Sequence, residues 1–302
     1  MNESDFLGRM AMSSSRRAAQ AKSEMPEVEL LRRAQELASP PSLAHDRDTF
    51  DVIAEIKLRS PSEGSLESTA ERADGDGIGA RAISYQRAGA AAISVLTEPS
   101  EFQGSLEHLA AAAAAVDVPV LRKDFLVDPY QVVEARVQGA GGVLLIARML
   151  SGGLLGDMLD TARGLEMFAL VEAFDAPDLH RIARLLERSA ADHILPPVLV
   201  GLNCRDLTTL AVEPERFAAL SGSFPPGFAA VAESGLHSLE DFARVAALGY
   251  DMALVGSALM REDDPADLLR RFIESGRRAC EEGTRGLPDS RDARTEDTCE
   301  SA

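Results

Sequence analysis

The sequence predicts a single (β/α)8 barrel of the TIM type, an α/β fold, with an extra N-terminal helix before the first strand. Short continuous apolar runs alternate with segments of helical spacing eight times along the chain. Continuous apolar strands that alternate with helices are typical of a parallel sheet covered by helices. The 302 residues, 45% of them hydrophobic, are enough for one large core, and eight units close most naturally into a barrel.

The N-terminal segment divides into two parts. Residues 1 to about 24 are rich in Ser, Ala and Arg without a sustained period, so we expect a mobile or partly helical lead-in. From Pro26, the spacing of Val28, Leu30, Leu31 and Ala34 predicts a helix that stops before Pro40-Pro41 and covers one end of the barrel. The expected organisation is an N-terminal extension and helix at 1–48, a barrel catalytic domain at 49–278 and a disordered acidic tail at 279–302.

The eight strands are expected at 52–56, 92–96, 118–121, 142–146, 167–171, 198–202, 229–232 and 252–255. Each is followed by a polar loop and a segment of helical spacing. Asp175 can cap the helix after the fifth strand, and Ser238 with Asp241 forms a capping box after the seventh. These start signals place a helix after each of those strands and support the repeated unit.

In a barrel, the carboxyl ends of all strands meet at one face, where active sites are built. The sequence puts these residues there: Glu55, Lys57, Ser60, Lys123, Glu172, Asn203, Arg205, Glu233, Ser234, Gly235, Gly256 and Ser257. One charged residue after a strand is as often a solvated loop position. Three carboxylates and two lysines at strand ends, in a chain that has only three lysines, favour chemistry over that plain interpretation.

Two groups of residues suggest specific roles. Ser234-Gly235 and Gly256-Ser257 follow the last two strands, where barrels often hold a phosphate on backbone N–H groups. Lys123 shares the mouth of the barrel with Lys57 and Arg205, whose positive charge should lower its pKa, although a neighbouring carboxylate would raise it. Glu172 ends an apolar strand, where burial suits a carboxyl group to general acid or base catalysis; its plainer role is to pair with a lysine.

The composition excludes several classes of function. A net charge of −18 makes nucleic-acid binding unfavourable because a phosphate backbone requires a basic face. No apolar run reaches the length of a membrane helix, and three cysteines without a CxxC pair support neither disulfides nor structural zinc. We therefore expect a cytoplasmic protein without a metal site. All five histidines are interpreted as structural or solvated.

The ordered motifs IAEIKLRSPSEG, SVLTEPSEFQGS, PVLRKDFLVDPYQ, ALVEAFD, VGLNCRDL, VAESG and LVGSALM span about residues 53–260. Together they resemble the indole-3-glycerol phosphate synthase family of tryptophan biosynthesis. The resemblance implies ring closure of 1-(2-carboxyphenylamino)-1-deoxyribulose 5-phosphate with loss of carbon dioxide and water, a carboxy-lyase reaction. It implies no cofactor and no metal, a small phosphorylated substrate as the partner, and a monomer or weak homo-oligomer.

The resemblance also assigns roles. Lys123 is similar to the family's general acid and Glu172 to the residue that removes the later proton. Lys57 resembles the lysine that holds the substrate carboxylate, with Ser60 beside it. The remaining matches are the polar residues Glu55, Asn203, Arg205 and Glu233 around the ribulose, the apolar residues Phe102 and Phe125 around the anthranilate ring, and the phosphate-site residues Ser234, Gly235, Gly256 and Ser257.

Three positions depart from the family's pattern. Phe174 replaces a common His, Cys204 replaces a second Asn beside Asn203, and Gly141-Gly142 replaces a common Ala-Asp. Two alternatives stay open. One is another phosphate-binding barrel, such as a phosphoribosylanthranilate isomerase, which would need a Cys and Asp acid/base pair at strand ends. The other is a ligand-binding barrel without catalysis.

Overall fold

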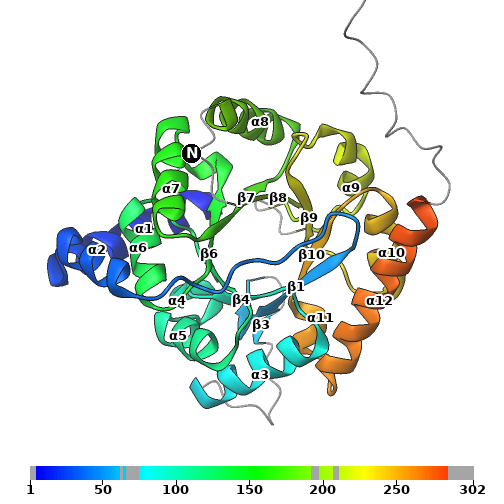
Figure 1. The fold of residues 1–302 in the computed structure, drawn as a ribbon, viewed down its shortest axis with the longest axis horizontal. Helices are drawn as coiled ribbons and strands as arrows, with labels where there is room; N and C mark the ends of the chain where they lie inside the picture. Colours follow the sequence, from blue (N-terminus) through cyan, green and yellow to red (C-terminus); the bar gives the residue numbers. More distant parts are fainter. Residues whose placement is uncertain (1–4, 62–63, 66–74, 192–196, 207–210, 285–302) are drawn as a thin grey trace, which may run out of the picture.

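The computed structural model is a closed barrel of eight parallel strands, in the ring order β1-β10-β9-β8-β7-β6-β5-β4, surrounded by helices (Figure 1). It describes residues 5–61, 64–65, 75–191, 197–206 and 211–284. Each strand pairs in parallel with both neighbours, and β1 closes the ring by pairing with β10 and β4. The predicted fold class is therefore confirmed.

The strands are short and almost wholly buried because helices cover the outside of the ring and side chains fill its inside. Their bounds are β1 Asp51–Ile56, β4 Ala92–Leu96, β5 Val120–Lys123, β6 Gly142–Ile146, β7 Phe168–Ala173, β8 Val198–Asn203, β9 Ala229–Glu233 and β10 Met252–Val255. A small hairpin, β2 Arg59–Ser60 with β3 Gly64–Ser65, follows β1. The third barrel strand starts later than predicted, since Pro119 has no N–H to donate to a ladder.

Helices of the outer ring follow the strands. They are α3 Gly75–Ala88, α4 Pro99–Phe102, α5 Leu106–Ala115, α6 Pro129–Val137, α7 Gly152–Gly164, α8 Ala176–Ala191, α9 Glu215–Leu220, α10 Leu239–Ala247, α11 Ser257–Met260 and α12 Pro265–Thr284, with short 3-10 turns at Ala147–Met149 and Ser221–Ser223. The capping box of Ser238 and Asp241 is present, and the Asp175 carboxylate accepts from the Asp178 N–H at 2.9 Å. Both predicted start signals are confirmed.

The first residues of the chain are more ordered than their sequence suggests. Residues Phe6–Glu24 form helix α1, whose N-cap Asp5 accepts from the Gly8 N–H, so the lead-in that was expected to be mobile or partly helical is a helix. Polar contacts to the barrel hold this helix. The Ser14 hydroxyl accepts from the Gln131 side chain, and Arg17 makes two hydrogen bonds, of 2.8 and 2.7 Å, to the buried Asp124.

The predicted second segment is helix α2, Glu27–Glu36. It packs against α6 rather than over an end of the barrel, so that part of the expectation is wrong. The covering element is the chain between α2 and β1, drawn in blue, which crosses one end of the ring in Figure 1. This segment makes hydrogen bonds to residues that lie just before β7 and β9. The Ser39 hydroxyl donates to the Glu166 carboxylate, and the Arg47 guanidinium donates to the Phe228 carbonyl.

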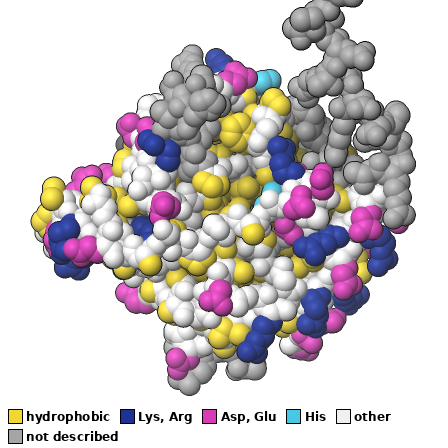
Figure 2. All heavy atoms as spheres, in the orientation of Figure 1, with side chains coloured by type: hydrophobic (Ala, Val, Ile, Leu, Met, Phe, Trp, Pro, Cys, Tyr) yellow, Lys and Arg dark blue, Asp and Glu magenta, His cyan; other side chains and the backbone are white. Residues whose placement is uncertain are grey.

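Figure 2 shows this same end of the molecule. Hydrophobic side chains gather near its middle, and Lys, Arg, Asp and Glu side chains lie mainly around its edge. Residues 279–284 of the segment expected to be a disordered tail belong to α12, and the rest of it, 285–302, lies outside the described residues. Within the described ranges, no helix is long and apolar enough to cross a membrane.

The Arg17 to Asp124 bridge gives a test of how α1 is attached. Replacing Arg17 by Ala leaves a fully buried carboxylate with only Arg122 and Thr97 as side-chain partners. Loss of one partner of a buried ion pair is costly, and we expect Arg17→Ala to lower the free energy of unfolding by about 2 kcal/mol in urea denaturation. Arg16→Ala, one residue away and exposed, should change it by less than about 0.5 kcal/mol. Equal effects of the two substitutions would contradict the attachment described here.

Candidate active site

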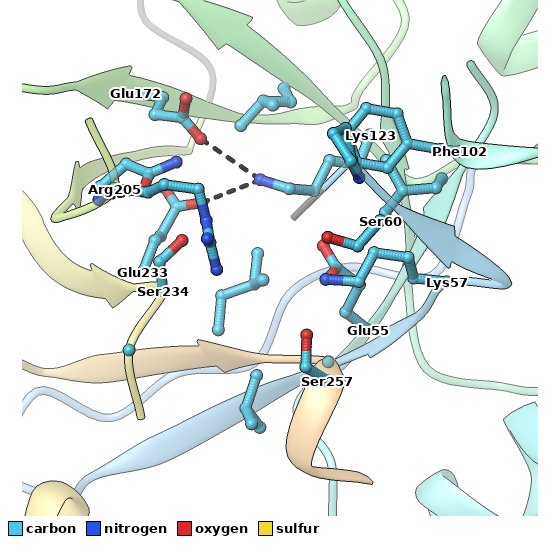
Figure 3. A pocket seen from close by; sticks show the side chains of 18 of the residues that line it. Glu55, Lys57, Ser60, Phe102, Lys123, Glu172, Arg205, Glu233, Ser234 and Ser257 are labelled. Atoms are coloured by element: carbon cyan, nitrogen blue, oxygen red, sulfur yellow. Dashed lines mark hydrogen bonds and ion pairs between the residues drawn. The ribbon is translucent and has the colours of Figure 1, made fainter. Parts of the chain in front are cut away.

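A cavity of about 970 Å³ opens at the carboxyl ends of the barrel strands. Every residue that the sequence placed in the site lines it, including the apolar Phe102 and Phe125. Figure 3 shows Phe102, Ser60 and Lys57 on one side and Arg205 and Ser234 on the other. The barrel thus brings together residues up to about two hundred positions apart, as the meeting of strand ends at one face requires.

At the centre of the cavity, one ammonium group faces two carboxylates (Figure 3). Lys123 Nζ lies 2.9 Å from Glu233 Oε2 and 3.2 Å from Glu172 Oε2. The two carboxylate side chains are 1% and 3% exposed and that of Lys123 is 15% exposed. Lys123 ends β5, Glu172 lies in β7 and Glu233 ends β9, so their contact depends on the curvature of the closed ring.

These residues form one layer of the barrel core. In such barrels a layer takes one side chain from each alternate strand. Here Glu55, Lys123, Glu172 and Glu233 come from the first, third, fifth and seventh barrel strands, β1, β5, β7 and β9. A second ion pair adjoins the layer, since Lys57 Nζ lies 3.0 Å from Glu55 Oε1. Apolar residues usually fill such layers, so charge here marks a functional site.

Two glycines, Gly201 within β8 and Gly256 directly after β10, make room for this charged layer. A Cβ added to Gly201 of β8 would lie 2.0 Å from Glu233 Oε1, and one added to Gly256 would lie 2.4 Å from Glu55 Oε1. Real Cβ atoms do not approach that closely. The absence of these two side chains therefore lets the carboxylates lie flat against the neighbouring backbone.

The pKa of Lys123 is controlled by its carboxylate neighbours. Burial alone lowers the pKa of the ammonium group, but the charges of Glu233, Glu172 and Glu55 outweigh burial and raise it. Of the two opposing effects expected from the sequence, the raising effect of carboxylates therefore prevails in the substrate-free protein. Burial also raises the pKa of Glu233; Lys123 opposes this and Glu172 adds to it, and the result is about 8.

The wall near Phe102 is aromatic. The rings of Phe102 and Phe125 lie 6.1 Å apart, and Phe6 of α1 packs edge-on against Phe125 at 5.8 Å. Helix α4 presents Phe102 because Glu98, wholly buried, accepts hydrogen bonds from three backbone N–H groups of its first turn. The arrangement forms a slot suited to a flat apolar ring.

The opposite wall is polar and built from backbone. Ser234 and Gly235 have φ values of 68° and 70°, a left-handed stretch that turns the chain sharply after β9. Ser257 starts the short helix α11 directly after Gly256. This wall thus carries small residues and hydroxyl groups, and Arg205 lines the same cavity.

Sequence reasoning missed several residues that line the cavity, among them Phe6 and His237. Phe6 lies in the segment expected to be mobile or partly helical, and no periodicity there marks it. His237 was interpreted as structural or solvated, yet it lies at the mouth beyond Gly235, where the Asp241 carboxylate accepts from its backbone N–H at 3.1 Å. The only signal for His237 was its place three residues after Ser234.

Of the three unusual positions, Phe174 and Cys204 lie near this site, whereas Gly141-Gly142 lies at the opposite end of the barrel, where β6 begins. The Arg148 guanidinium stacks over the Phe174 ring at 4.5 Å. Burial raises the pKa of the Cys204 thiol to about 11, and the thiol donates to the Ser234 carbonyl at 3.2 Å. The ring of Phe168 occupies the space where Gly142 lacks a side chain.

In the described part of the chain, no group of three or more His, Cys, Asp or Glu side chains is placed so that it could hold a metal ion.

Comparisons with known proteins agree on one family. A family profile described as indole-3-glycerol phosphate synthase matches residues 9–272. A protein of that name from Nocardioides is 46% identical over 221 residues, which covers 73% of this chain and 79% of that protein. Its counterpart from Parafrankia is 44% identical over 225 residues, covering 74% and 78%.

Solved structures show the fold alone. The 3-hexulose-6-phosphate synthase from Salmonella typhimurium aligns with a TM-score of 0.57 at 13% identity, over 76% of this chain and 99% of that one. An N-acetylmannosamine-6-phosphate 2-epimerase from Clostridium perfringens aligns with a TM-score of 0.52 at 15% identity, over 79% and 99%.

The glycine neighbours of the charged layer can be tested by substitution. Gly201→Ala places a methyl group against the buried Glu233 carboxylate, and such overpacking should lower the free energy of unfolding by about 1–3 kcal/mol. Gly156→Ala is the control: it lies inside α7 with no atom within 4 Å of the new Cβ. It should raise the free energy of unfolding by up to about 1 kcal/mol. Urea denaturation that gives the same sign for both would contradict the close approach.

Proposed function

The chain belongs to the indole-3-glycerol phosphate synthase family, and from this we propose that its barrel closes the indole ring. The substrate is 1-(2-carboxyphenylamino)-1-deoxyribulose 5-phosphate, and the products are indole-3-glycerol phosphate, carbon dioxide and water. The reaction is that of a carbon–carbon lyase, specifically a carboxy-lyase.

The observation that carries this proposal is the position of Lys123. Its ammonium group lies on the cavity floor between an aromatic wall and a polar backbone wall. The substrate has an aromatic ring at one end, a phosphate at the other and a ketone between them. We place the substrate ring beside Phe102 and Phe125 and the phosphate beside Ser234, Gly235, Gly256 and Ser257. In this position the ketone lies next to Lys123.

Ring closure needs an acid at the ketone. The ring carbon that bears the carboxylate attacks the carbonyl carbon, and negative charge develops on the carbonyl oxygen. Lys123 donates a proton to that oxygen, a form of general acid catalysis that contributes about 10²- to 10⁴-fold. Holding both ends of the flexible substrate brings the two carbons together and removes much of the entropic barrier. The apolar wall excludes water and so strengthens the effect of the cation.

Two further steps complete the reaction. Loss of carbon dioxide from the attacking ring carbon returns the electron pair of the broken bond to the ring and restores the benzene system. Glu172 then removes a proton from the carbon beside the nitrogen and passes it to the hydroxyl group made in the first step, which leaves as water and completes the indole. The buried place of Glu172, 3.2 Å from Lys123, supports proton transfer between the two residues.

Lys57 and Ser60 are assigned to the substrate carboxylate. Lys57 lies on the aromatic side of the cavity (Figure 3), and its ammonium group is paired with Glu55 in the substrate-free protein. Asn203, Arg205 and Glu233 surround the place where the ribulose hydroxyl groups would lie. These polar groups can orient the sugar chain by hydrogen bonds.

The alternative functions have less support. A phosphoribosylanthranilate isomerase would need a Cys and Asp pair. Among the residues that line the cavity there is no cysteine, and the lining Asp124 is bound by Arg17. A binding protein without catalysis would not need charged groups in place of an apolar core layer, which makes that alternative the weaker one.

We also propose that the protein works in the cytoplasm without a cofactor, as a monomer or weak homo-oligomer. The two cysteines in the described residues, Cys204 and Cys280, are free thiols. Free thiols are typical of a reducing compartment.

The proposal is tested by measuring indole-3-glycerol phosphate formation by fluorescence, with metal-free protein. Lys123→Ala should lower kcat by at least about 10²-fold while substrate still binds in an equilibrium titration. The matched control is Lys22→Ala, which removes a lysine of α1 that pairs with Asp128, the N-cap of α6, and should leave kcat within a few-fold. Near-normal turnover in Lys123→Ala would show that another group is the acid. Binding without turnover by the wild-type protein would favour a binding protein instead.

Phe6 provides a second test, because the sequence did not suggest it. Phe6→Ala removes one face of the aromatic slot and should raise KM by about 10-fold, as expected for loss of a buried aromatic contact. Phe6→Leu keeps an apolar side chain and should recover most of the loss. A KM that does not change in Phe6→Ala would mean that the substrate ring binds elsewhere.

A further inference from the structure

The charges of the side chains paired around Lys123 do not balance, and the imbalance centres on Glu233. Three carboxylates, Glu55, Glu172 and Glu233, share the layer and its edge with two ammonium groups, Lys57 and Lys123. If all five were ionised, these paired groups would carry one excess negative charge; Arg205, on the polar wall of the same cavity, is a further cation outside these pairs. Burying an excess charge is costly, and proteins commonly avoid that cost by neutralising one group.

Glu233 is the carboxylate with the poorest set of partners. Its Oε2 accepts from Lys123, but its Oε1 is buried and has no hydrogen-bond partner among the described residues. That oxygen lies against the bare backbone of Gly201, where no donor approaches. Glu55 pairs with Lys57, whereas Glu233 and Glu172 share the single ammonium group of Lys123.

Groups from every neighbouring strand face Glu233. The charged and polar ones that line the same cavity are Lys123, Glu172, Glu55, Lys57, Asn203, Arg205 and Ser234. Among the described residues, Lys123 donates a hydrogen bond to Glu233, and the Glu172 carboxyl group interacts with Glu233 directly. Burial and the charge of Glu172 raise the pKa of Glu233 to about 8 against the opposing effect of Lys123, in agreement with the count of charges. Carboxyl groups coupled this closely titrate as a pair.

We propose that the pair Glu172 and Glu233 holds one proton in the substrate-free protein, that Glu233 carries it, and that its loss sets the alkaline limit of turnover. The last part rests on the proposed function. The proton removes the excess charge before a substrate with its own carboxylate and phosphate arrives. Binding two anionic groups in a cavity that already carries an excess negative charge would otherwise be opposed by repulsion.

The proton on Glu233 also explains how Lys123 can act as an acid. Carboxylates raise the pKa of Lys123, and an ammonium held too tightly is a poor donor. With Glu233 neutral, Lys123 faces one carboxylate fewer and gives its proton to the ketone oxygen more readily. Above the pH at which Glu233 ionises, Lys123 keeps its proton and ring closure slows. Glu233 thus controls the acid strength of Lys123 in addition to contacting the sugar.

Infrared spectroscopy tests the proton directly, without need of activity. In substrate-free wild-type protein, the carbonyl stretch of a protonated carboxylic acid should be present near neutral pH and disappear as the pH rises through about 8. Glu233→Gln should lack this band. Glu172→Gln removes the charge that raises the pKa of Glu233, so its band should disappear at lower pH than in the wild type. An unchanged band in Glu233→Gln, or none in the wild type at neutral pH, would overturn the proposal.

The kinetic arm uses the pH dependence of kcat/KM. The wild type should lose about tenfold per pH unit above its alkaline limit. The Gln side chain in Glu233→Gln is neutral at every pH. Whatever kcat/KM this variant has at neutral pH should therefore not fall as the pH rises through that range. An alkaline limit that stays at the same pH in Glu233→Gln would assign it to another group and overturn the proposal. If the wild type formed no indole-3-glycerol phosphate at all, the proposed function would fail, while the infrared band would still decide where the proton is.

Discussion

The contact of Lys123 with two buried carboxylates is the interaction on which the site depends. It exists only because the barrel closes: the third, fifth and seventh barrel strands each give one inward side chain to the same layer. An open sheet of the same strands would leave these groups too far apart to meet. The last layer of core packing before the barrel mouth has therefore been converted into a reactive layer, with charged groups where Leu or Val usually lie.

That conversion carries a structural cost that neighbouring residues reduce. Charged side chains pack poorly against apolar ones. Gly201 in β8 and Gly256 directly after β10 have no side chain and so leave room for the carboxylates of Glu233 and Glu55. Helix α1 closes the layer from above with Phe6 and is fixed by Arg17 to Asp124, the residue directly after Lys123. Burial behind α1 keeps the local dielectric constant low, which strengthens each charge interaction at the reacting centre.

The sequence predicts the barrel and its strand ends well because both depend on local patterns. Continuous apolar runs reveal buried strands, and the rule that strand ends converge places Lys123, Glu172 and Glu233 together without any knowledge of the coordinates. Helix α1 was missed for a physical reason. Its attachment uses polar pairs such as Arg17 with Asp124 and Gln131 with Ser14, which are more than a hundred residues apart, and no periodicity in the helix itself records them.

The direction of the pKa shift of Lys123 could not be decided from the sequence for a related reason. Sequence gives the types of residue at the mouth but not which of them are nearest, and the sign of the shift depends on distances of 3 Å. The sequence shows both cations and carboxylates at the strand ends and does not indicate which of them lies nearer to Lys123. The two glycines decide the outcome, because they let the carboxylates lie deep beside Lys123 while Arg205 stays toward the polar wall.

Phe174 and Cys204 lie just outside the charged layer, and their packing explains how they are accommodated, whereas Gly141-Gly142 lies at the other end of the barrel, where β6 begins. The Arg148 guanidinium stacks on the Phe174 ring, and the Phe174 backbone N–H donates a hydrogen bond to the Asp178 carboxylate. These two contacts hold the chain after Glu172 from both sides. Cys204 stays a neutral thiol that donates to Ser234 and fixes the turn of the polar wall. Neither side chain contacts Lys123, so these substitutions act on the backbone that carries Glu172 and Ser234 rather than on the groups that transfer protons.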